Sequence, residues 1–170
     1  RPTILVIGGS SGSVVINNAV RESLDEILPG FQVIHLCGKG HLDESLKDKK
    51  GYVQFEYISK ELRDLFALAD LVISRAGANA ICELLALKKP NILIPLSKAA
   101  SRGDQILNAK SFKKNGFSYV IEEEELSKTS LLNAIRDVFT HREQYIKAMN
   151  ESEMSDSIGT IMRLIQELAK

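Results

Sequence analysis

The stretch Thr3-Ile4-Leu5-Val6-Ile7-Gly8-Gly9 decides the fold class. A threonine and four aliphatic residues that run directly into glycine are typical of a strand buried on both faces, as in a parallel sheet. Apolar residues at helical spacing follow over 14–28, and Pro29-Gly30 ends that helix. A buried strand, a glycine-containing turn and a helix in this order indicate the first half of a βαβ unit.

The same alternation continues through most of the chain and predicts one domain over residues 1–170. We expect a Rossmann-like α/β fold, in which helices cover both faces of a parallel sheet. Ser59 and the capping-box pattern Thr140-x-x-Glu143 are expected to begin two helices, and Gly116 to end another. The further expected strands are 31–36, 52–57, 71–73, 92–94 and 119–121, and the further expected helices are 60–68, 78–87, 105–115, 131–139, 142–150 and 158–168.

Composition excludes several classes of protein. Lys plus Arg and Asp plus Glu each number 22, so the basic excess that nucleic-acid binders usually carry is missing, and we expect no nucleic-acid partner. No apolar run approaches the roughly 20 residues that span a bilayer. Cys37 and Cys82 have no metal-ligand spacing, which predicts free thiols and no metal site. The chain starts at Arg1 and not at Met, so we expect a domain of a longer protein.

Ligands of open parallel sheets bind beyond the carboxyl ends of the strands, so the loops at that edge are the candidate sites. The first is Gly8-Gly9-Ser10-Ser11-Gly12-Ser13, after the first strand. Its glycines permit close approach of backbone, and the amides of the following helix can receive a phosphate. It matches neither a Walker loop nor G-x-G-x-x-G, and a tight strand-to-helix turn is the plain alternative.

The second candidate loop follows the expected strand 71–73 and again joins small residues to a helix start. Small side chains there expose the amides to an anion. Glu83 lies about one and a half turns into the helix, where it either accepts hydrogen bonds from sugar hydroxyls or is an ordinary exposed glutamate. Arg75 either faces a phosphate or forms a structural ion pair. The residues of this loop and helix start are Arg75, Gly77, Ala78, Asn79, Ala80 and Glu83.

The third candidate is the polar loop that ends in Asp104 and Gln105. A carboxylate and an amide side by side suit sugar hydroxyls, although Asp104 is also a typical N-cap. At the end of the expected strand 52–57, the backbone of Ile58 either reads the edge of a base or belongs to the core. The three histidines have no catalytic partner pattern and are expected to be satisfied or solvated, and Glu122–Glu125 is expected to be a solvated loop.

Taken in order, these motifs resemble the C-terminal half of the MurG family. That family consists of bacterial glycosyltransferases of the GT-B superfamily, family 28, which add N-acetylglucosamine to lipid I and thereby make lipid II for peptidoglycan. The similarity covers about residues 3–168. The motifs that carry it are Gly8-Gly9-Ser10-x-Gly12, Ala69-Asp70-Leu71-Val72-Ile73-Ser74-Arg75-Ala76-Gly77-Ala78-x-x-x-x-Glu83, Pro90-x-x-x-x-Pro95 and Asp104-Gln105-x-x-Asn108-Ala109.

The resemblance implies a site for UDP-N-acetylglucosamine, with no cofactor and no metal. It implies that the Ile58 backbone reads the uracil and that Glu83 holds the ribose hydroxyls. Asp104 and Gln105 would hold the hexose hydroxyls. The groups implied near the pyrophosphate are Ser10 and the helix amides of Ala78, Asn79 and Ala80, with Gly9, Ser11, Gly12, Arg75 and Gly77 as further candidates.

In that family the catalytic base and the lipid-linked acceptor belong to the N-terminal half, so the resemblance implies no catalytic residue in this chain. The last helices, about 141–170, would pack toward that half. The whole enzyme would act at the cytoplasmic face of the cell membrane as a peripheral protein, while the fragment itself would be soluble. Two alternatives are a donor-binding subunit of a split GT-B glycosyltransferase with a membrane partner and, ranked lower, a UDP-sugar epimerase-type protein. A purely structural domain is the fourth reading.

Overall fold

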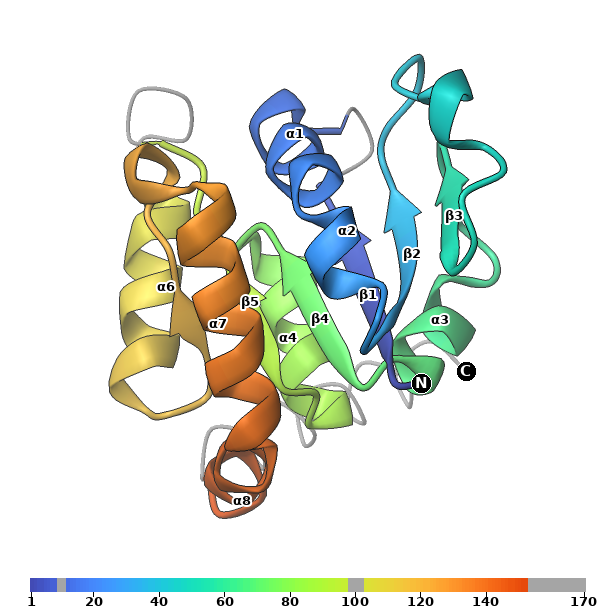
Figure 1. Ribbon diagram of the computed structural model, residues 1–170. Coiled ribbons are helices and arrows are strands. Elements are labelled where there is room, and N and C mark those ends of the chain that lie inside the picture. The colour runs from blue at the N-terminus through green and yellow to red at the C-terminus, as the bar shows by residue number, and fades with distance from the viewer. Residues whose placement is uncertain (9–11, 98–102, 153–170) are drawn as a thin grey trace, which may run out of the picture.

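A single six-stranded parallel sheet forms the centre of the molecule (Figure 1). The computed structural model describes residues 1–8, 12–97 and 103–152. The strand order is β3-β2-β1-β4-β5-β6, and every neighbouring pair is parallel. The strands are β1 (Thr3–Ile7), β2 (Gln32–Leu36), β3 (Tyr52–Phe55), β4 (Leu71–Ser74), β5 (Asn91–Leu93) and β6 (Tyr119–Val120).

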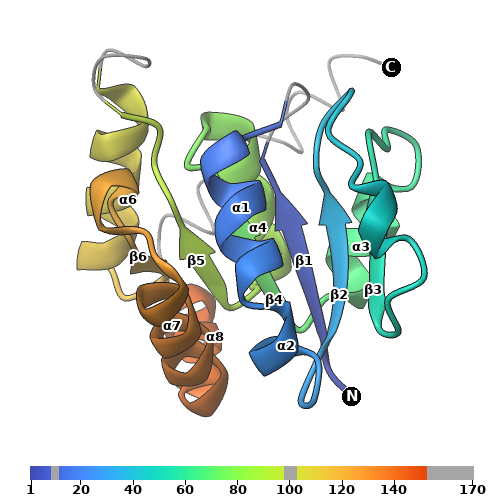
Figure 2. The ribbon, with the colours of Figure 1, turned by 45° about the horizontal axis from the view of Figure 1, so that its top comes forward.

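Helices cover both faces of this sheet (Figures 1 and 2). One face carries α1 (Val14–Glu22), α2 (Leu24–Ile27) and α7 (Lys128–Thr140). The other carries α3 (Leu62–Leu68), α4 (Ala78–Leu87), α6 (Asp104–Lys114) and α8 (Arg142–Asn150). Two short 3-10 turns, η1 (Glu44–Leu46) and η2 (Glu123–Glu125), lie in the connections. The expected Rossmann-like α/β fold is confirmed.

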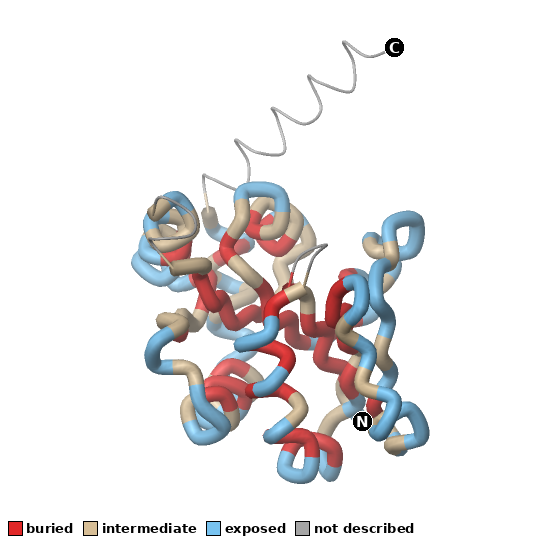
Figure 3. Tube along the Cα trace, turned by 90° about the horizontal axis from the view of Figure 1, so that it is seen from above, coloured by how far each residue is buried: buried red, intermediate tan, exposed pale blue. Residues whose placement is uncertain are grey.

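Two hydrophobic cores follow from the alternation of side chains along the buried strands. Ile4 and Val6 of β1 pack in the core under α1 and α7, whereas Leu5 between them packs in the core under α4 and α6. Successive side chains of a strand point to opposite faces, so a continuous apolar strand supplies both cores. In Figure 3, seen from above, buried stretches (red) run through the middle of the molecule, and most exposed stretches (pale blue) lie at its rim.

The first helical stretch, predicted as continuous over 14–28, breaks at Ser23. The Ser23 side chain is buried and donates a hydrogen bond to the carbonyl of Ala19 at 2.7 Å. A serine that bonds back to the preceding turn favours a bend, and the two helices α1 and α2 meet at this residue. Apolar spacing on both sides hides such a local break from the sequence pattern.

Two predicted helix caps are wrong. Helix α3 has Glu61 at its N-cap, without a capping side chain, so Ser59 does not start it. Helix α8 likewise begins after His141 with no side-chain cap, and the predicted capping box does not form. A capping box is present instead at the start of α7, between Ser127 and Ser130. Gly116 has the predicted left-handed conformation, with φ of 78°.

Helix α8 is attached to this domain through Met149, which is fully buried in the same core as α4 and α6. The predicted helix 158–168 lies outside the described residues. Among the described helices, none combines the length and the apolarity that a membrane-spanning segment requires.

Candidate functional site

The strand order places a crevice between the carboxyl ends of β1 and β4. From β1 the chain crosses to β2 on one side, and from β4 it crosses to β5 on the other, so the two connections diverge. Ile7 and Ser74, the last residues of the two strands, are paired in the sheet. The loop 8–13 and the loop 75–77 therefore start side by side. In open α/β sheets, ligands bind at this switch point.

The start of α4 presents backbone amides at this crevice that have no partner among residues 1–8, 12–97 and 103–152. Gly77 is its N-cap, and no side chain of the described residues caps the helix. The first intrahelical bond runs from the Ile81 amide to the Gly77 carbonyl at 3.0 Å, which leaves the amides of residues 78–80 without an intrahelical partner. Ala78 and Asn79 are exposed, and the first turn holds no acidic residue. Such a terminus attracts an anion.

Glu83 lies further along α4, on the side that faces α3. Its carboxylate is half-buried, and its Oε1 is 3.9 Å from the Nε atom of Arg63 on α3. Ile58, in the segment that leads into α3, is also half-buried and packs against the same core. The packing of α3 against α4 thus brings Ile58 and Glu83 to one end of the crevice.

Gln105 connects two of the loops at the opposite end of the crevice. Its Oε1 accepts hydrogen bonds from the Leu96 amide at 2.9 Å and from the Ala76 amide at 3.3 Å. Asp104 is exposed and is the first residue of α6, whose N-cap is Gly103 with φ of 87°. The alternative in which Asp104 caps its own helix is therefore wrong, and its carboxylate is open to solvent.

Arg75 joins the loops that follow four strands. Its guanidinium donates to Ser13 Oγ at 2.8 Å and to the Ile94 carbonyl at 3.2 Å, and it forms an ion pair with Glu123 at 3.2 Å. Of the two readings of Arg75, the structure shows the ion pair. The prediction that Glu122–Glu125 is a plain solvated loop is wrong for Glu123, whose side chain is only 20% exposed.

A buried hydrogen-bond network that sequence reasoning missed supports the glycine loop. Asn17 Nδ2 donates to the Cys37 carbonyl at 2.9 Å, so its Oδ1 must accept from His35 Nε2 at 2.8 Å. His35 Nδ1 then accepts from Tyr52 Oη at 2.7 Å. His35 is therefore neutral and satisfied, as expected. Burial, and secondly the charge of Arg21, lower the pKa of His35 to about 3.

The network explains why residue 12 is glycine. A Cβ atom on Gly12 would stand 2.2 Å from the Cys37 carbonyl oxygen, and the φ of Gly12 is 80°. The end of the glycine loop at Gly12 thus packs directly against the Cys37 carbonyl group, which Asn17 holds in place by its hydrogen bond. Gly9, Ser10 and Ser11 lie outside the described residues. An asparagine one turn into the helix after a glycine loop is the sequence signal for this support, because its amide can reach a neighbouring strand end.

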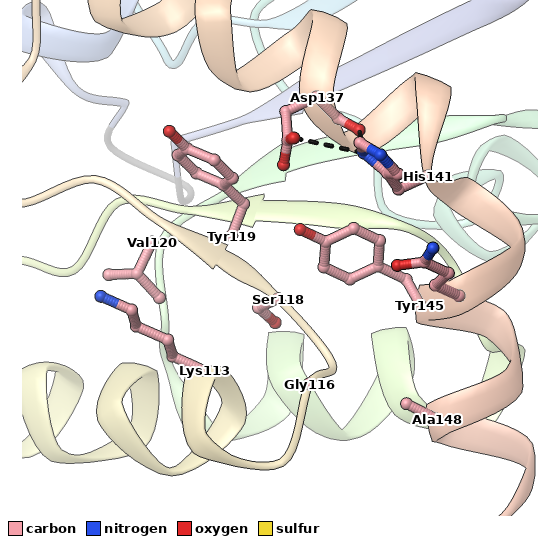
Figure 4. A pocket seen from close by; sticks show the side chains of 10 residues that line it. Lys113, Gly116, Ser118, Tyr119, Val120, Asp137, His141, Tyr145 and Ala148 are labelled. Atoms are coloured by element: carbon pink, nitrogen blue, oxygen red, sulfur yellow. Dashed lines mark hydrogen bonds and ion pairs between the residues drawn. The ribbon is translucent and has the colours of Figure 1, made fainter.

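A separate hollow of about 700 Å³ lies at the amino end of β6 (Figure 4). Asp137 and His141 face each other there at 3.2 Å, and burial, followed by the Asp137 charge, raises the pKa of Tyr145. The described residues that line it include none of those predicted to bind the donor. We therefore place the candidate site at the switch point.

The family model of the glycosyltransferase family 28 C-terminal domain matches residues 3–163. The chain belongs to this family. Within family 28, it is 62% identical over 170 residues to the UDP-N-acetylglucosamine--N-acetylmuramyl-(pentapeptide) pyrophosphoryl-undecaprenol N-acetylglucosamine transferase of Lachnospira eligens. It is 56% identical over 170 residues to the enzyme of the same name from Clostridium botulinum. Each match covers the whole of this chain and 48% of the relative, so the chain spans about half the length of these relatives.

Solved structures agree with the family 28 fold. MurG of Acinetobacter baumannii superposes with a TM-score of 0.79 at 21% identity, over 98% of this chain and 50% of that one. The spinosyn rhamnosyltransferase SpnG complexed with thymidine diphosphate superposes with a TM-score of 0.70 at 17% identity, over 100% and 45%. The resemblance to the MurG family and to the GT-B fold is confirmed.

Proposed function

We propose that this domain is the donor-binding half of a glycosyltransferase that moves N-acetylglucosamine from UDP-N-acetylglucosamine to lipid I. The names of relatives at 55–62% identity support the reaction. The observation that carries the donor site is the start of α4 at the switch point, which no described side chain caps, because it offers amides where a pyrophosphate can approach. Glu83 and Gln105 lie on opposite sides of this helix start, so the two ends of the site carry different side chains.

The order of these groups along the crevice matches the order of the three parts of a nucleotide sugar. The base and ribose would lie toward α3, with the uracil at the Ile58 backbone and the ribose hydroxyls at Glu83. The pyrophosphate would lie at the start of α4 and against the glycine loop, and the hexose toward α6. The groups assigned to the pyrophosphate are Ser10 and the amides of Ala78, Asn79 and Ala80, and those assigned to the hexose are Asp104 and Gln105.

In the transfer, negative charge accumulates on the departing UDP. Fixed amides and the dipole of α4 stabilise that charge without reorganising, which is the contribution this half makes to the inverting, metal-independent reaction that the family resemblance implies. We assign no catalytic base to this chain. The base and the lipid-linked acceptor would come with the other half, at the cytoplasmic face of the membrane, where the whole protein would be peripheral.

Calorimetric titration of the chain tests the donor assignment. UDP should bind and ADP should bind far more weakly. Glu83→Ala should weaken UDP binding by about 1–3 kcal/mol, because it removes a charged hydrogen-bond partner of the ribose. Glu143→Ala, on the exposed first turn of α8, is the matched control and should leave UDP affinity unchanged. Equal UDP affinity for the wild type and Glu83→Ala would contradict the ribose assignment.

The hexose end needs a different variant. Gln105 already braces two loops through its Oε1, so Gln105→Ala would disturb UDP and UDP-N-acetylglucosamine alike. Asp104 is exposed and takes no part in capping, which makes it the cleaner probe. Asp104→Ala should lower the affinity for UDP-N-acetylglucosamine and leave that for UDP unchanged. An unchanged affinity for both ligands would remove Asp104 from the site.

A further inference from the structure

The backbone of Ala76, directly before the N-cap of α4, is held at two points by side chains of α6, one in each of its two peptide groups. The Ala76 amide donates to Gln105 Oε1 at 3.3 Å, and the Ala76 carbonyl accepts from Asn108 Nδ2 at 2.9 Å. Gln105 and Asn108 are three residues apart on α6, so their side chains lie on one face of that helix. Ala76 itself is fully buried. Two amide side chains of a neighbouring helix thus fix the backbone at a residue whose own side chain is a methyl group.

The hydrogen bond from Asn108 to the Ala76 carbonyl determines which way the N–H group of Gly77 points. The Ala76 carbonyl and the Gly77 amide belong to one planar trans peptide unit, in which C=O and N–H point in opposite directions. When Asn108 binds the carbonyl, the Gly77 N–H has to point away from α6. Gly77 is the N-cap of α4 and has no side chain with which to set its own orientation, and no side chain of the described residues caps the helix.

We propose that Asn108 is a positioning residue for the donor pyrophosphate, through its hydrogen bond to the Ala76 carbonyl. By fixing that peptide plane, it aims the Gly77 amide and the first turn of α4 at the phosphates. The inference rests on the proposed function, since it concerns the phosphate end of that donor site. Gln105 acts on the same residue but is also assigned to the hexose, so Asn108 is the side chain that reports on positioning alone.

The test compares UDP with uridine, which lacks the phosphates. In Asn108→Asp the carboxylate has nearly the same shape but cannot donate to the Ala76 carbonyl, and it repels that oxygen. UDP affinity, measured by calorimetry, should fall about tenfold or more, whereas uridine affinity, measured by ligand-observed NMR, should stay the same. Asn115→Asp is the matched control. Asn115 lies at the end of the same helix, and its side chain donates to the Ser111 carbonyl at 2.8 Å, away from the start of α4, so neither ligand should be affected.

Each outcome decides the proposal. An unchanged UDP affinity, or an equal loss for UDP and uridine, would overturn it, since the first shows no positioning and the second shows general disruption. If the wild type binds neither UDP nor uridine, the proposed function fails as well; if the wild type binds UDP and Asn108→Asp binds it equally, this inference fails alone. If Asn108→Asp does not fold, an NMR measurement on the wild-type protein still tests the proposal. Addition of UDP, but not of uridine, should shift the Gly77 amide resonance, and the absence of that shift would overturn the proposal.

Discussion

Lowering the pH should destabilise the fold through a single buried side chain, His35. Its pKa is about 3 in the folded protein and about 6.5 in an unfolded chain. Between these values the unfolded chain binds a proton that the folded protein refuses, so the free energy of unfolding falls as the pH falls. The slope is about 1.4 kcal/mol per pH unit below 6.5, which amounts to a loss of about 2 kcal/mol between pH 8 and pH 5.

The structural reason is that every polar atom of the His35 ring is already in use. Its Nε2 donates to Asn17 and its Nδ1 accepts from Tyr52, so a second proton on Nδ1 would end the hydrogen bond that Tyr52 donates and would sit beside the Arg21 charge. Urea unfolding followed by circular dichroism at pH 8, 7, 6 and 5 measures the slope. His35→Gln should flatten it, whereas His141→Gln, at the exposed end of α7, should not. Parallel curves for the wild type and His35→Gln would refute the reasoning.

Two further predictions concern backbone conformation. Gly12→Ala should lower the free energy of unfolding by at least about 1–2 kcal/mol, because Gly12 has a positive φ and the added Cβ would stand 2.2 Å from a carbonyl oxygen. Gly30→Ala, whose Cβ meets nothing within 4 Å, is the control in the calorimetric measurement. Equal melting temperatures for the wild type and Gly12→Ala would contradict the close approach. Lys88→Gly should raise the free energy of unfolding by about 1 kcal/mol, since Lys88 ends α4 in the left-handed conformation with φ of 54°; no gain in denaturant unfolding would count against that strain.

The fold class was predictable because buried parallel strands and amphipathic helices leave local signals. The run at 3–7 and the apolar spacing of α4 and α6 each identify an element without knowledge of its neighbours. The family motifs also depend on short stretches. Helix caps were predicted less well, because a serine or threonine near a helix start competes with backbone geometry that only the completed packing decides, as Ser59 and Thr140 show.

The candidate site was predictable as a set of loops but not as a geometry. The sequence places glycines, small residues and Asp104-Gln105 after strands, and parallel strands end at one edge. The order of the strands in the sheet could not be predicted from these local patterns, so the switch point between β1 and β4 was known only once the sheet itself was described. The role of Glu123 was missed for the same reason, since its partner Arg75 is 48 residues away.

The amino-acid sequence by itself therefore determined most of the strands and helices, their alternation and the family motifs, because each depends on residues within one helical turn, one strand or one loop, although it did not show the break at Ser23. Only the tertiary structure decided which polar groups meet. Asn17, His35 and Tyr52 come from three elements, and Asn108 reaches Ala76 across 32 residues of chain. Such pairings carry no periodic signal. They exist because buried polar groups need hydrogen-bond partners, and the order of the strands decides which partners come within reach.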